Sequence, residues 1–320
     1  MIYPQFIQEG NTIGVCAPSA GIGSKLERFK KAKKFFSANK IKIKETAHIR
    51  VDNERSCSAK QRAKELDELV CDKKVDAIIA AAGGDYMFEM MPYVNFEHIK
   101  ENPKWLHGMS DPTNLLFTVT TKLDIATLYG YNAVQYGDGT KDLETGLKYL
   151  TGKIVKQKPF KIYHDYKNPE EDKKVNYIYK KDININGRLI GGCLDVIDKL
   201  IGTKYDYTND FIDRYKEDGI IWYFDIFAMS SYNFYLTLLQ MKEAGYFRYC
   251  KGVLIGRVAF PNIENKKLDY SKAADKVLGN IPHILEMDIG HTDYPWVLIN
   301  GAICNVICNK DKKEISFKLK

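Results

Sequence analysis

The stretch VDAIIAAAGG at residues 75–84 decides the fold of the first half of the chain. Its first eight residues are mostly small or β-branched and do not alternate with polar ones, which is typical of a strand that is covered on both faces. The two glycines then permit a sharp turn, and we expect a short helix near Phe88–Tyr93. In an open α/β sheet, ligands bind where such strands end. Residues 83–88 are therefore the first candidate site.

The same rhythm of strands and helices continues on both sides of this stretch. Apolar runs alternate with segments of helical spacing, which predicts a Rossmann-like parallel sheet with helices on both faces. The predicted strands are 12–17, 41–45, 75–82, 105–110 and 125–129, and the predicted helices are 25–39, 59–70 and 113–121.

The second half of the chain has a different pattern. We expect a helix to open at Gly191-Gly192, strands and helices to alternate, and a hairpin through 304–308 and 315–319 to close the chain. Strands outnumber helices there, so a smaller α+β, barrel-like domain is predicted. The predicted division is an N-terminal α/β domain at 1–165, a crossover linker at 166–185 and a C-terminal domain at 186–320.

Composition narrows the function classes. Lys and Arg exceed Asp and Glu by 48 to 41, but this charge of +7 is spread thinly and no nucleic-acid-binding motif accompanies it, so we expect no nucleic-acid partner. The seven cysteines contain no CxxC pair, and we expect neither a disulfide framework, nor a metal site, nor a cofactor. The N-terminus does not resemble a signal peptide and no apolar run approaches about 20 residues, which predicts a cytoplasmic protein without membrane contact.

Six segments occur in the order and spacing of one known family. They are GNTIGVCAPS at 10–19, GGDYMF at 83–88, GMSDPT at 108–113, GRLIGG at 187–192, IIWYFD at 220–225 and DIGHTD at 288–293. Through them the chain resembles the LD-carboxypeptidase family, which includes the microcin C self-immunity hydrolases. The resemblance covers nearly the whole length.

The resemblance implies a serine peptidase with a Ser-His-Glu triad and no metal. It implies that the N-terminal domain carries the serine, that the C-terminal domain carries glutamate and histidine, and that substrate lies between them. The implied substrate is a muropeptide cut before a terminal D-residue during cell-wall recycling, and relatives cleave a nucleotidyl-peptide antibiotic. A homodimer is also implied.

Carrying the triad over gives an uneven result. The histidine corresponds to His291, the serine position to Met87 and the glutamate position to Phe224. Asp225 lies one residue beyond, where strand alternation predicts that its side chain faces away. Cys193 stands where the family commonly has asparagine.

Met87 and Phe224 both lack a chemical group that the triad requires at their positions. The thioether of Met87 has no proton to lose and cannot serve as an acyl-transfer nucleophile. The ring of Phe224 cannot orient an imidazole or stabilise its charged form. With only His291 retained, the sequence favours a catalytically impaired homologue.

Further residues in the turns of these motifs are expected to contact the ligand. Asp85 is a candidate for binding an ammonium group, although a turn-stabilising role is the alternative. Ser110 imitates half of a Gly-x-Ser-x-Gly motif, but the resemblance favours a structural turn. The full set of expected ligand-binding residues is Gly83, Gly84, Asp85, Phe88, Ser110, Asp111, Cys193 and Asp225.

Three functions remain open at this point. The first is a pseudoenzyme that binds a peptide-type or muropeptide-like ligand between its domains. The second is an active hydrolase with a rearranged site that uses Ser110, Cys193 or a water activated by His291. The third is a scaffold protein that binds no ligand.

Overall fold

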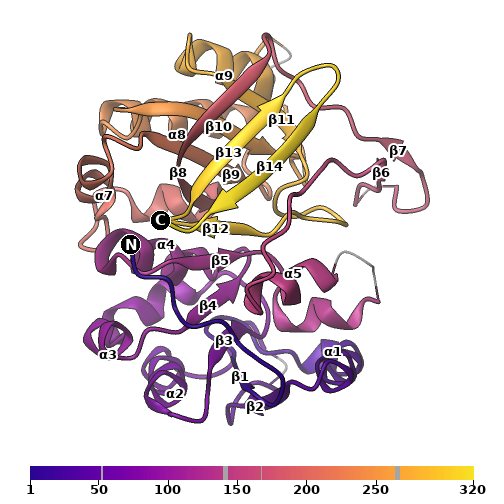
Figure 1. The fold of residues 1–320 in the computed structure, drawn as a ribbon, viewed down its shortest axis with the longest axis vertical. Helices are drawn as coiled ribbons and strands as arrows, with labels where there is room; N and C mark the ends of the chain where they lie inside the picture. The colour runs from indigo at the N-terminus through magenta and orange to yellow at the C-terminus, as the bar shows by residue number, and fades with distance from the viewer. Residues whose placement is uncertain (52, 140–142, 167, 264–266) are drawn as a thin grey trace. The chain divides into compact units, whose positions relative to one another are not determined.

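The computed structural model describes residues 1–51, 53–139, 143–166, 168–263 and 267–320, and the chain forms two compact units (Figure 1). The first unit is Met1–Val155 with Val297–Asn300, and the second is Lys156–Trp296 with Gly301–Lys320. The chain thus returns to the first unit for one short segment, which a linear division of the sequence does not contain. Residues 140–142 of the predicted N-terminal domain and residue 167 of the predicted crossover linker lie outside the described residues.

The first unit is built on a six-stranded sheet in the order β12-β5-β4-β3-β1-β2. Strands β1 to β5 run parallel, and β12 joins β5 in the antiparallel direction. Every residue of β3, β4 and β5 is buried, as the apolar run at 75–82 predicts for a strand covered on both sides. The strands are β1 (Thr12–Cys16), β2 (Lys42–Glu45), β3 (Ala77–Ala80), β4 (Trp105–Gly108), β5 (Thr127–Tyr129) and β12 (Leu298–Asn300).

The helices of the first unit follow the strands in the predicted order, with additions. The short helix after Gly84 is a 3-10 helix. The sequence pattern did not predict α3 (Phe96–Glu101) or the 3-10 helices η1 (Gly23–Lys25) and η3 (Ala133–Gly137). The helical elements are η1 (Gly23–Lys25), α1 (Leu26–Ala38), α2 (Ala59–Cys71), η2 (Met87–Tyr93), α3 (Phe96–Glu101), α4 (Thr113–Leu123), η3 (Ala133–Gly137) and α5 (Leu143–Leu150).

The second unit contains a curled six-stranded sheet in the order β11-β10-β9-β8-β13-β14 (Figure 1). Strands β8 to β11 are parallel, whereas β13 pairs antiparallel with both β8 and β14. This mixed, curled sheet confirms the prediction of an α+β, barrel-like second domain. Its strands are β8 (Ile183–Cys193), β9 (Ile220–Asp225), β10 (Cys250–Gly256), β11 (His283–Met287), β13 (Ile303–Cys308) and β14 (Lys313–Lys318), and β6 (Ile162–Tyr163) pairs separately with β7 (Lys173–Lys174).

The GRLIGG segment lies inside β8, a strand of 11 residues. The strand ends one residue after the two glycines, and α6 begins at the next residue. Glycine allows this strand to lie close to β9, because a Cβ on Gly191 would stand 1.9 Å from the carbonyl oxygen of Tyr223. The helices of this unit are α6 (Leu194–Leu200), α7 (Thr208–Arg214), α8 (Ser231–Glu243) and α9 (Tyr270–Leu278). Among the described helices, none combines the length and apolar character needed to cross a membrane.

The burial pattern along α1 offers a test of how the core of the first unit is packed. Phe36 is fully buried with its ring centroid 4.8 Å from that of Tyr136, whereas the adjacent Phe35 is partly exposed. We expect Phe36→Ala to lower the free energy of unfolding by about 3–5 kcal/mol and Phe35→Ala by clearly less. Denaturant titration of both variants measures the difference, and equal losses would contradict the burial pattern of α1.

Candidate active site

Three loops meet at the carboxyl ends of β1, β3 and β4, where a ligand site was predicted. A Cβ on Gly84, which has a φ of +150°, would stand 2.4 Å from the hydroxyl of Ser19. A Cβ on Gly83 would stand 3.1 Å from the Cβ of Ser110. The two glycines are therefore required so that the turn after β3 can fit between the loops that follow β1 and β4.

The buried carboxylate of Asp111 holds these loops together. It accepts hydrogen bonds from the hydroxyl of Ser19, from the backbone N–H of Met87 at 2.8 Å and from the amide of Asn114 at 2.9 Å. Burial raises the pKa of Asp111 to about 6, and the nearby charge of Asp85 acts in the same direction, although the bonds from Ser19 and Met87 oppose it. Asp111 is therefore a buried structural anchor of the elbow.

Met87 occupies the predicted nucleophile position at the start of η2. Its side chain is fully buried and lines a cavity of about 20 Å³ in the core of the first unit, together with Cys16, Leu66 and Ile78. Its backbone N–H is engaged by Asp111 and is not free to stabilise an oxyanion. Position 87 thus presents neither a nucleophile nor a free amide.

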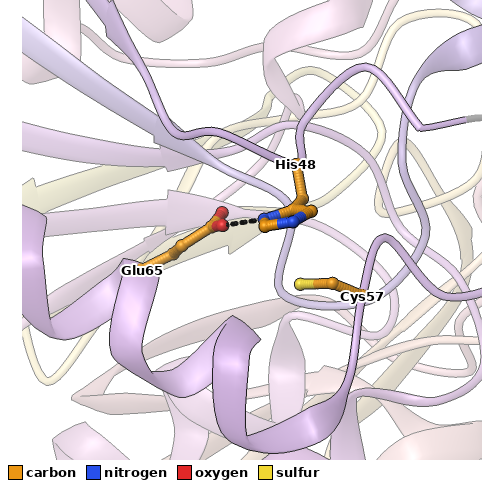
Figure 2. A group of neighbouring side chains, drawn as sticks. All are labelled: His48, Cys57 and Glu65. Atoms are coloured by element: carbon orange, nitrogen blue, oxygen red, sulfur yellow. Dashed lines mark hydrogen bonds and ion pairs between the residues drawn. The ribbon is translucent and has the colours of Figure 1, made fainter.

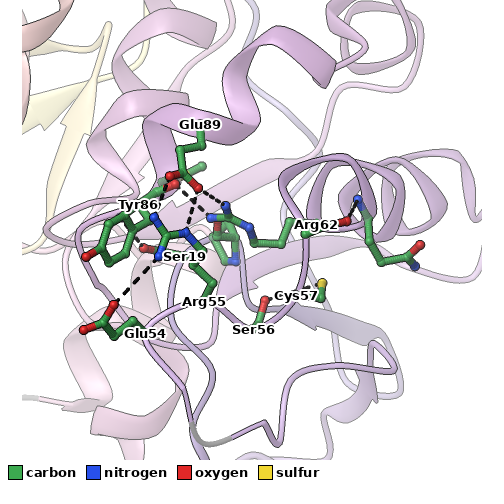
Figure 3. A network of polar contacts seen from close by, with 12 residues as sticks. Ser19, Glu54, Arg55, Ser56, Cys57, Arg62, Tyr86 and Glu89 are labelled. Carbon is green, nitrogen blue, oxygen red and sulfur yellow. Dashed lines mark hydrogen bonds and ion pairs between the residues drawn. The ribbon is translucent and has the colours of Figure 1, made fainter.

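A network of charged residues forms the wall beside the elbow (Figure 3). The Arg55 guanidinium lies 3.5 Å from the ring centroid of Tyr86 and forms an ion pair of 2.7 Å with Glu89. The buried Arg62 donates to the carbonyls of Pro18 and Tyr86, both at 2.9 Å, and pairs with Glu89 at 3.1 Å. These contacts fix the backbone around Tyr86.

In the second unit, Asp225 and His291 form an acid–imidazole pair. Asp225 is the last residue of β9 and is fully buried, and its carboxylate lies 2.8 Å from Nδ1 of His291. It also accepts the backbone N–H of His291 at 3.1 Å. Gly290 makes this approach possible, since its φ is +81° and a Cβ there would stand 1.9 Å from the carboxyl carbon of Asp225.

This geometry corrects one expectation. The prediction that Asp225 faces away from His291 is wrong, because the histidine lies on the same face of β9 as Asp225. Phe224 projects from the other face, where its ring stacks on Trp222 with centroids 5.7 Å apart. The acid that contacts His291 therefore comes from Asp225 and not from position 224.

The pair sets the chemistry of His291. Burial alone would lower the pKa of His291, but the charge of Asp225 and its hydrogen bond outweigh burial and raise it above 6.5. Because Asp225 engages Nδ1, Nε2 is the nitrogen available for proton transfer. The arrangement is the acid–base half of a triad.

Cys193 is a candidate nucleophile that lies beside this pair. It ends β8 directly opposite Asp225, and its sulfur lies within 4.8 Å of a His291 nitrogen and an Asp225 oxygen. The neighbouring Asp195 accepts the backbone N–H groups of Phe227 and Ala228 at 2.9 and 3.0 Å, which fixes the loop beside the pair.

The structure thus groups the expected site residues into two sets. One set surrounds the elbow of the first unit, with Phe88 exposed at its edge, and the other surrounds His291 in the second unit. The sequence did not point to Ser19, to the charged wall formed by Arg55, Arg62 and Glu89, or to Asp195. Ser19 lies in a quoted motif, but nothing in the sequence marks it as the partner of Asp111.

The family models of known proteins match both halves of the chain. The LD-carboxypeptidase N-terminal domain matches residues 13–130, and the LD-carboxypeptidase C-terminal domain matches residues 186–306. The chain belongs to the LD-carboxypeptidase family. The two matched segments hold the elbow and the Asp225–His291 pair respectively, so both site halves lie within family domains.

Curated relatives of this LD-carboxypeptidase family member have modest identity. A putative carboxypeptidase of Vibrio cholerae is 28% identical over 223 residues, which cover 64% of this chain and 66% of the relative. The putative carboxypeptidase YocD of Bacillus subtilis is 25% identical over 321 residues, with 95% and 96% covered. The microcin C self-immunity protein MccF of Escherichia coli is 28% identical over 219 residues, with 61% and 62% covered.

Solved structures share the fold over the whole chain. MccF in complex with aspartyl sulfamoyl adenosine has a TM-score of 0.85 at 22% identity, covering 100% of this chain and 99% of that one. MccF in complex with glutamyl sulfamoyl guanosine has a TM-score of 0.84 at 21% identity, with 99% and 98% covered. Muramoyltetrapeptide carboxypeptidase from Oxalobacter formigenes has a TM-score of 0.78 at 17% identity, with 96% and 98% covered.

Asp225→Asn tests the electrostatics of the pair. Removing the negative charge should lower the pKa of His291, since burial is then opposed only by the more distant charge of Asp195. An NMR titration of the imidazole protons measures this, with the His291 signal identified by its absence in His291→Gln. A pKa that does not change would contradict the ion pair.

The same pair has a defined effect on stability. A raised pKa in the folded state means that the pair stabilises the fold below about pH 6.5 and that this contribution is lost as pH rises through the raised value. The stability difference between the native protein and Asp225→Asn should therefore be largest in mild acid and shrink as the pH increases.

Gly290→Ala tests the close approach of the histidine loop. It should move His291 away from Asp225 and lower the pKa of His291, besides costing at least about 1 kcal/mol for the left-handed backbone. Gly279→Ala is the matched control, because Gly279 also has a positive φ, +57°, but its Cβ would meet nothing within 4 Å. If both variants leave the pKa of His291 unchanged, the steric argument fails.

Proposed function

We propose that this LD-carboxypeptidase family member is a pseudoenzyme that binds a peptide-type ligand and does not cleave it by serine acyl transfer. The observation that carries the proposal is the state of position 87. Its side chain is methionine, it is packed into the core, and its backbone amide is bound by Asp111. A serine peptidase needs a nucleophile and oxyanion donors at this turn.

The retained Asp225–His291 pair changes the extent of the proposed loss. The sequence suggested that both the nucleophile and the acid were missing, but Asp225 supplies an acid to His291. The proposed impairment therefore rests on the nucleophile alone. In the proposed binding role, the pair gives His291 a fixed orientation and a charge at mildly acidic pH, both of which suit recognition of an anionic group.

The proposed ligand class follows the relatives. The MccF structures contain an aspartyl sulfamoyl adenosine and a glutamyl sulfamoyl guanosine, and the Oxalobacter relative is named for a muramoyltetrapeptide. We therefore propose an aminoacyl conjugate or a muropeptide as ligand. A cytoplasmic location and a homodimer belong to the same proposal and rest on the family resemblance.

A second candidate function is supported by Cys193. Its sulfur lies within 4.8 Å of a His291 nitrogen and an Asp225 oxygen, so a small movement of the side chain would bring the thiol to the hydrogen-bond distance that a thiol hydrolase needs. In that case His291 would take the thiol proton, the sulfur would attack the substrate carbonyl, and the leaving amine would receive the proton. The product would be a thioester that water then hydrolyses.

Binding and turnover separate the two functions. We expect isothermal titration calorimetry to detect binding of a muropeptide tetrapeptide or aspartyl sulfamoyl adenosine, and mass spectrometry to detect no release of the terminal residue. His291→Ala should weaken binding by roughly 10-fold or more, the value of a charged hydrogen bond, whereas His98→Ala in α3 should leave binding unchanged.

Two results would count against the pseudoenzyme. Turnover that Cys193→Ala abolishes would establish the thiol hydrolase in its place. The absence of binding to either ligand would refute the proposed ligand class.

A further inference from the structure

A second cluster of reactive side chains lies in the first unit, outside the elbow and the Asp225–His291 pair. His48 follows β2, and its Nδ1 contacts a carboxylate oxygen of Glu65 on α2 (Figure 2). Cys57 comes from the loop that leads into α2. One donor atom from each of these three residues lies within 4.8 Å of the other two.

The three donors converge because of how α2 begins. Ser58 caps this helix by accepting the backbone N–H of Gln61, which fixes Cys57 immediately before the first turn. Glu65 lies two turns further on, on the buried face of the helix. The turn after β2 then places His48 against both, and Figure 2 shows its ring between Glu65 and Cys57.

The charge of Glu65 is unusual for its environment. Its side chain is only 4% exposed, and a buried carboxylate ordinarily requires a cation or several donors. Among the described residues, no Lys or Arg forms an ion pair with Glu65; its contacts include His48, which is an ion-pair partner only when its imidazole is protonated, and, at 3.5 Å, Gln61. Arg62, one turn earlier, is directed to Glu89 and to the carbonyls of the elbow.

We propose that His48, Cys57 and Glu65 bind a zinc ion. Imidazole nitrogen, thiolate sulfur and carboxylate oxygen are the three donor types that zinc takes in proteins, at about 2.0–2.3 Å. Tetrahedral zinc with such bonds separates its ligand atoms by roughly 3.3–3.8 Å, so ligands already within 4.8 Å need only small side-chain movements. The fourth position is left to water.

The location of the cluster suits a metal that enters from solution. The side chain of His48 is 41% exposed, whereas that of Glu65 is buried, so the cluster is open on the histidine side. Zinc would place a permanent positive charge beside the buried Glu65 carboxylate and would hold Cys57 as a thiolate.

The proposed zinc would also support the elbow. Ser56, next to Cys57, donates its backbone N–H to the carbonyl of Ser19 at 3.0 Å and its hydroxyl to the carbonyl of Ala17 at 2.7 Å. Figure 3 shows Ser56 and Cys57 beside the Arg55–Tyr86 contact. Fixing Cys57 therefore fixes the loop that lines the elbow, which assigns the metal a structural role.

Two other groups of potential ligands fit a cation less well. In the cluster of Asp67, Cys71 and His98, one histidine nitrogen already contacts both partners, at 2.8 and 3.4 Å. The Asp67 side chain is 34% exposed, so its carboxylate is solvated and does not require a cation. The cluster of Cys193, Asp225 and His291 belongs to the candidate active site.

Cobalt substitution tests the site on the full chain. We expect one equivalent of Co²⁺ to give a sulfur-to-cobalt charge-transfer band in the near ultraviolet, and Zn²⁺ to displace it. Cys57→Ser should abolish the band, and His48→Asn and Glu65→Gln should each weaken binding at least about 10-fold. Cys71→Ser and Cys193→Ser are the matched controls and should retain the band and the affinity.

Thermal unfolding gives a second measurement that does not depend on the absorption band. Zn²⁺ should raise the midpoint of the native protein and of the Cys71→Ser and Cys193→Ser controls, and leave Cys57→Ser unchanged. Circular dichroism of each variant confirms that the fold is retained.

The outcomes decide the proposal. Absence of a charge-transfer band in the native protein, or persistence of the band in Cys57→Ser, would overturn it. Loss of the band in Cys71→Ser alone would move the site to the cluster on α2 and α3, and would overturn it equally.

Discussion

The buried carboxylate of Asp111 is the constraint on which the elbow depends. Its two oxygens accept hydrogen bonds from the hydroxyl of Ser19 after β1, from the backbone N–H of Met87 after β3 and from the amide of Asn114 in the first turn of α4. Burial raises the pKa of Asp111 to about 6, so the ionised form is disfavoured in the fold. The free energy of unfolding therefore falls as the pH rises from about 4 to 6, because Asp111 ionises more readily in the unfolded chain. This destabilisation persists at neutral pH. The role of Asp111 is therefore to position the backbone of the elbow and not to stabilise the fold.

The sequence predicted the first unit well because its signals are local. The apolar run before Gly83 gave the buried central strand β3, and the alternation around it gave the strand and helix order. The sequence did not predict features that depend on contacts between residues far apart along the chain. Strand β12 pairs with β5 of the first unit although it lies late in the sequence, and β8 extends through a glycine pair that resembles a helix-opening turn.

The sequence indicated which segments form the candidate site, but it did not indicate which residue of β9 contacts His291. The motifs placed Met87, Asp111, Cys193 and His291 in the right turns. They placed the acid at Phe224, because counting along a strand cannot show which face a distant loop will cover. The loop at Gly290 brings His291 onto the face of Asp225, and that contact is visible only in three dimensions.

The His48, Cys57 and Glu65 cluster left no recognisable signal either. Its ligands are of three kinds at irregular spacing, across a strand end, a loop and a helix. The absence of CxxC pairs excludes the common cysteine-rich zinc motifs, but it says nothing about sites with mixed donors.

The elbow and the Asp225–His291 pair are packed in different ways. The Met87 side chain fills core volume beside Leu66 and Ile78, so a serine in its place would leave a cavity and a buried hydroxyl in apolar surroundings. The first unit is thus packed around methionine. In the second unit, the contact between His291 and Asp225 depends on residue 290 having no side chain, because a Cβ there would stand 1.9 Å from the carboxyl carbon of Asp225. The elbow is therefore held by a large apolar side chain, whereas the acid–imidazole pair is held by the absence of one.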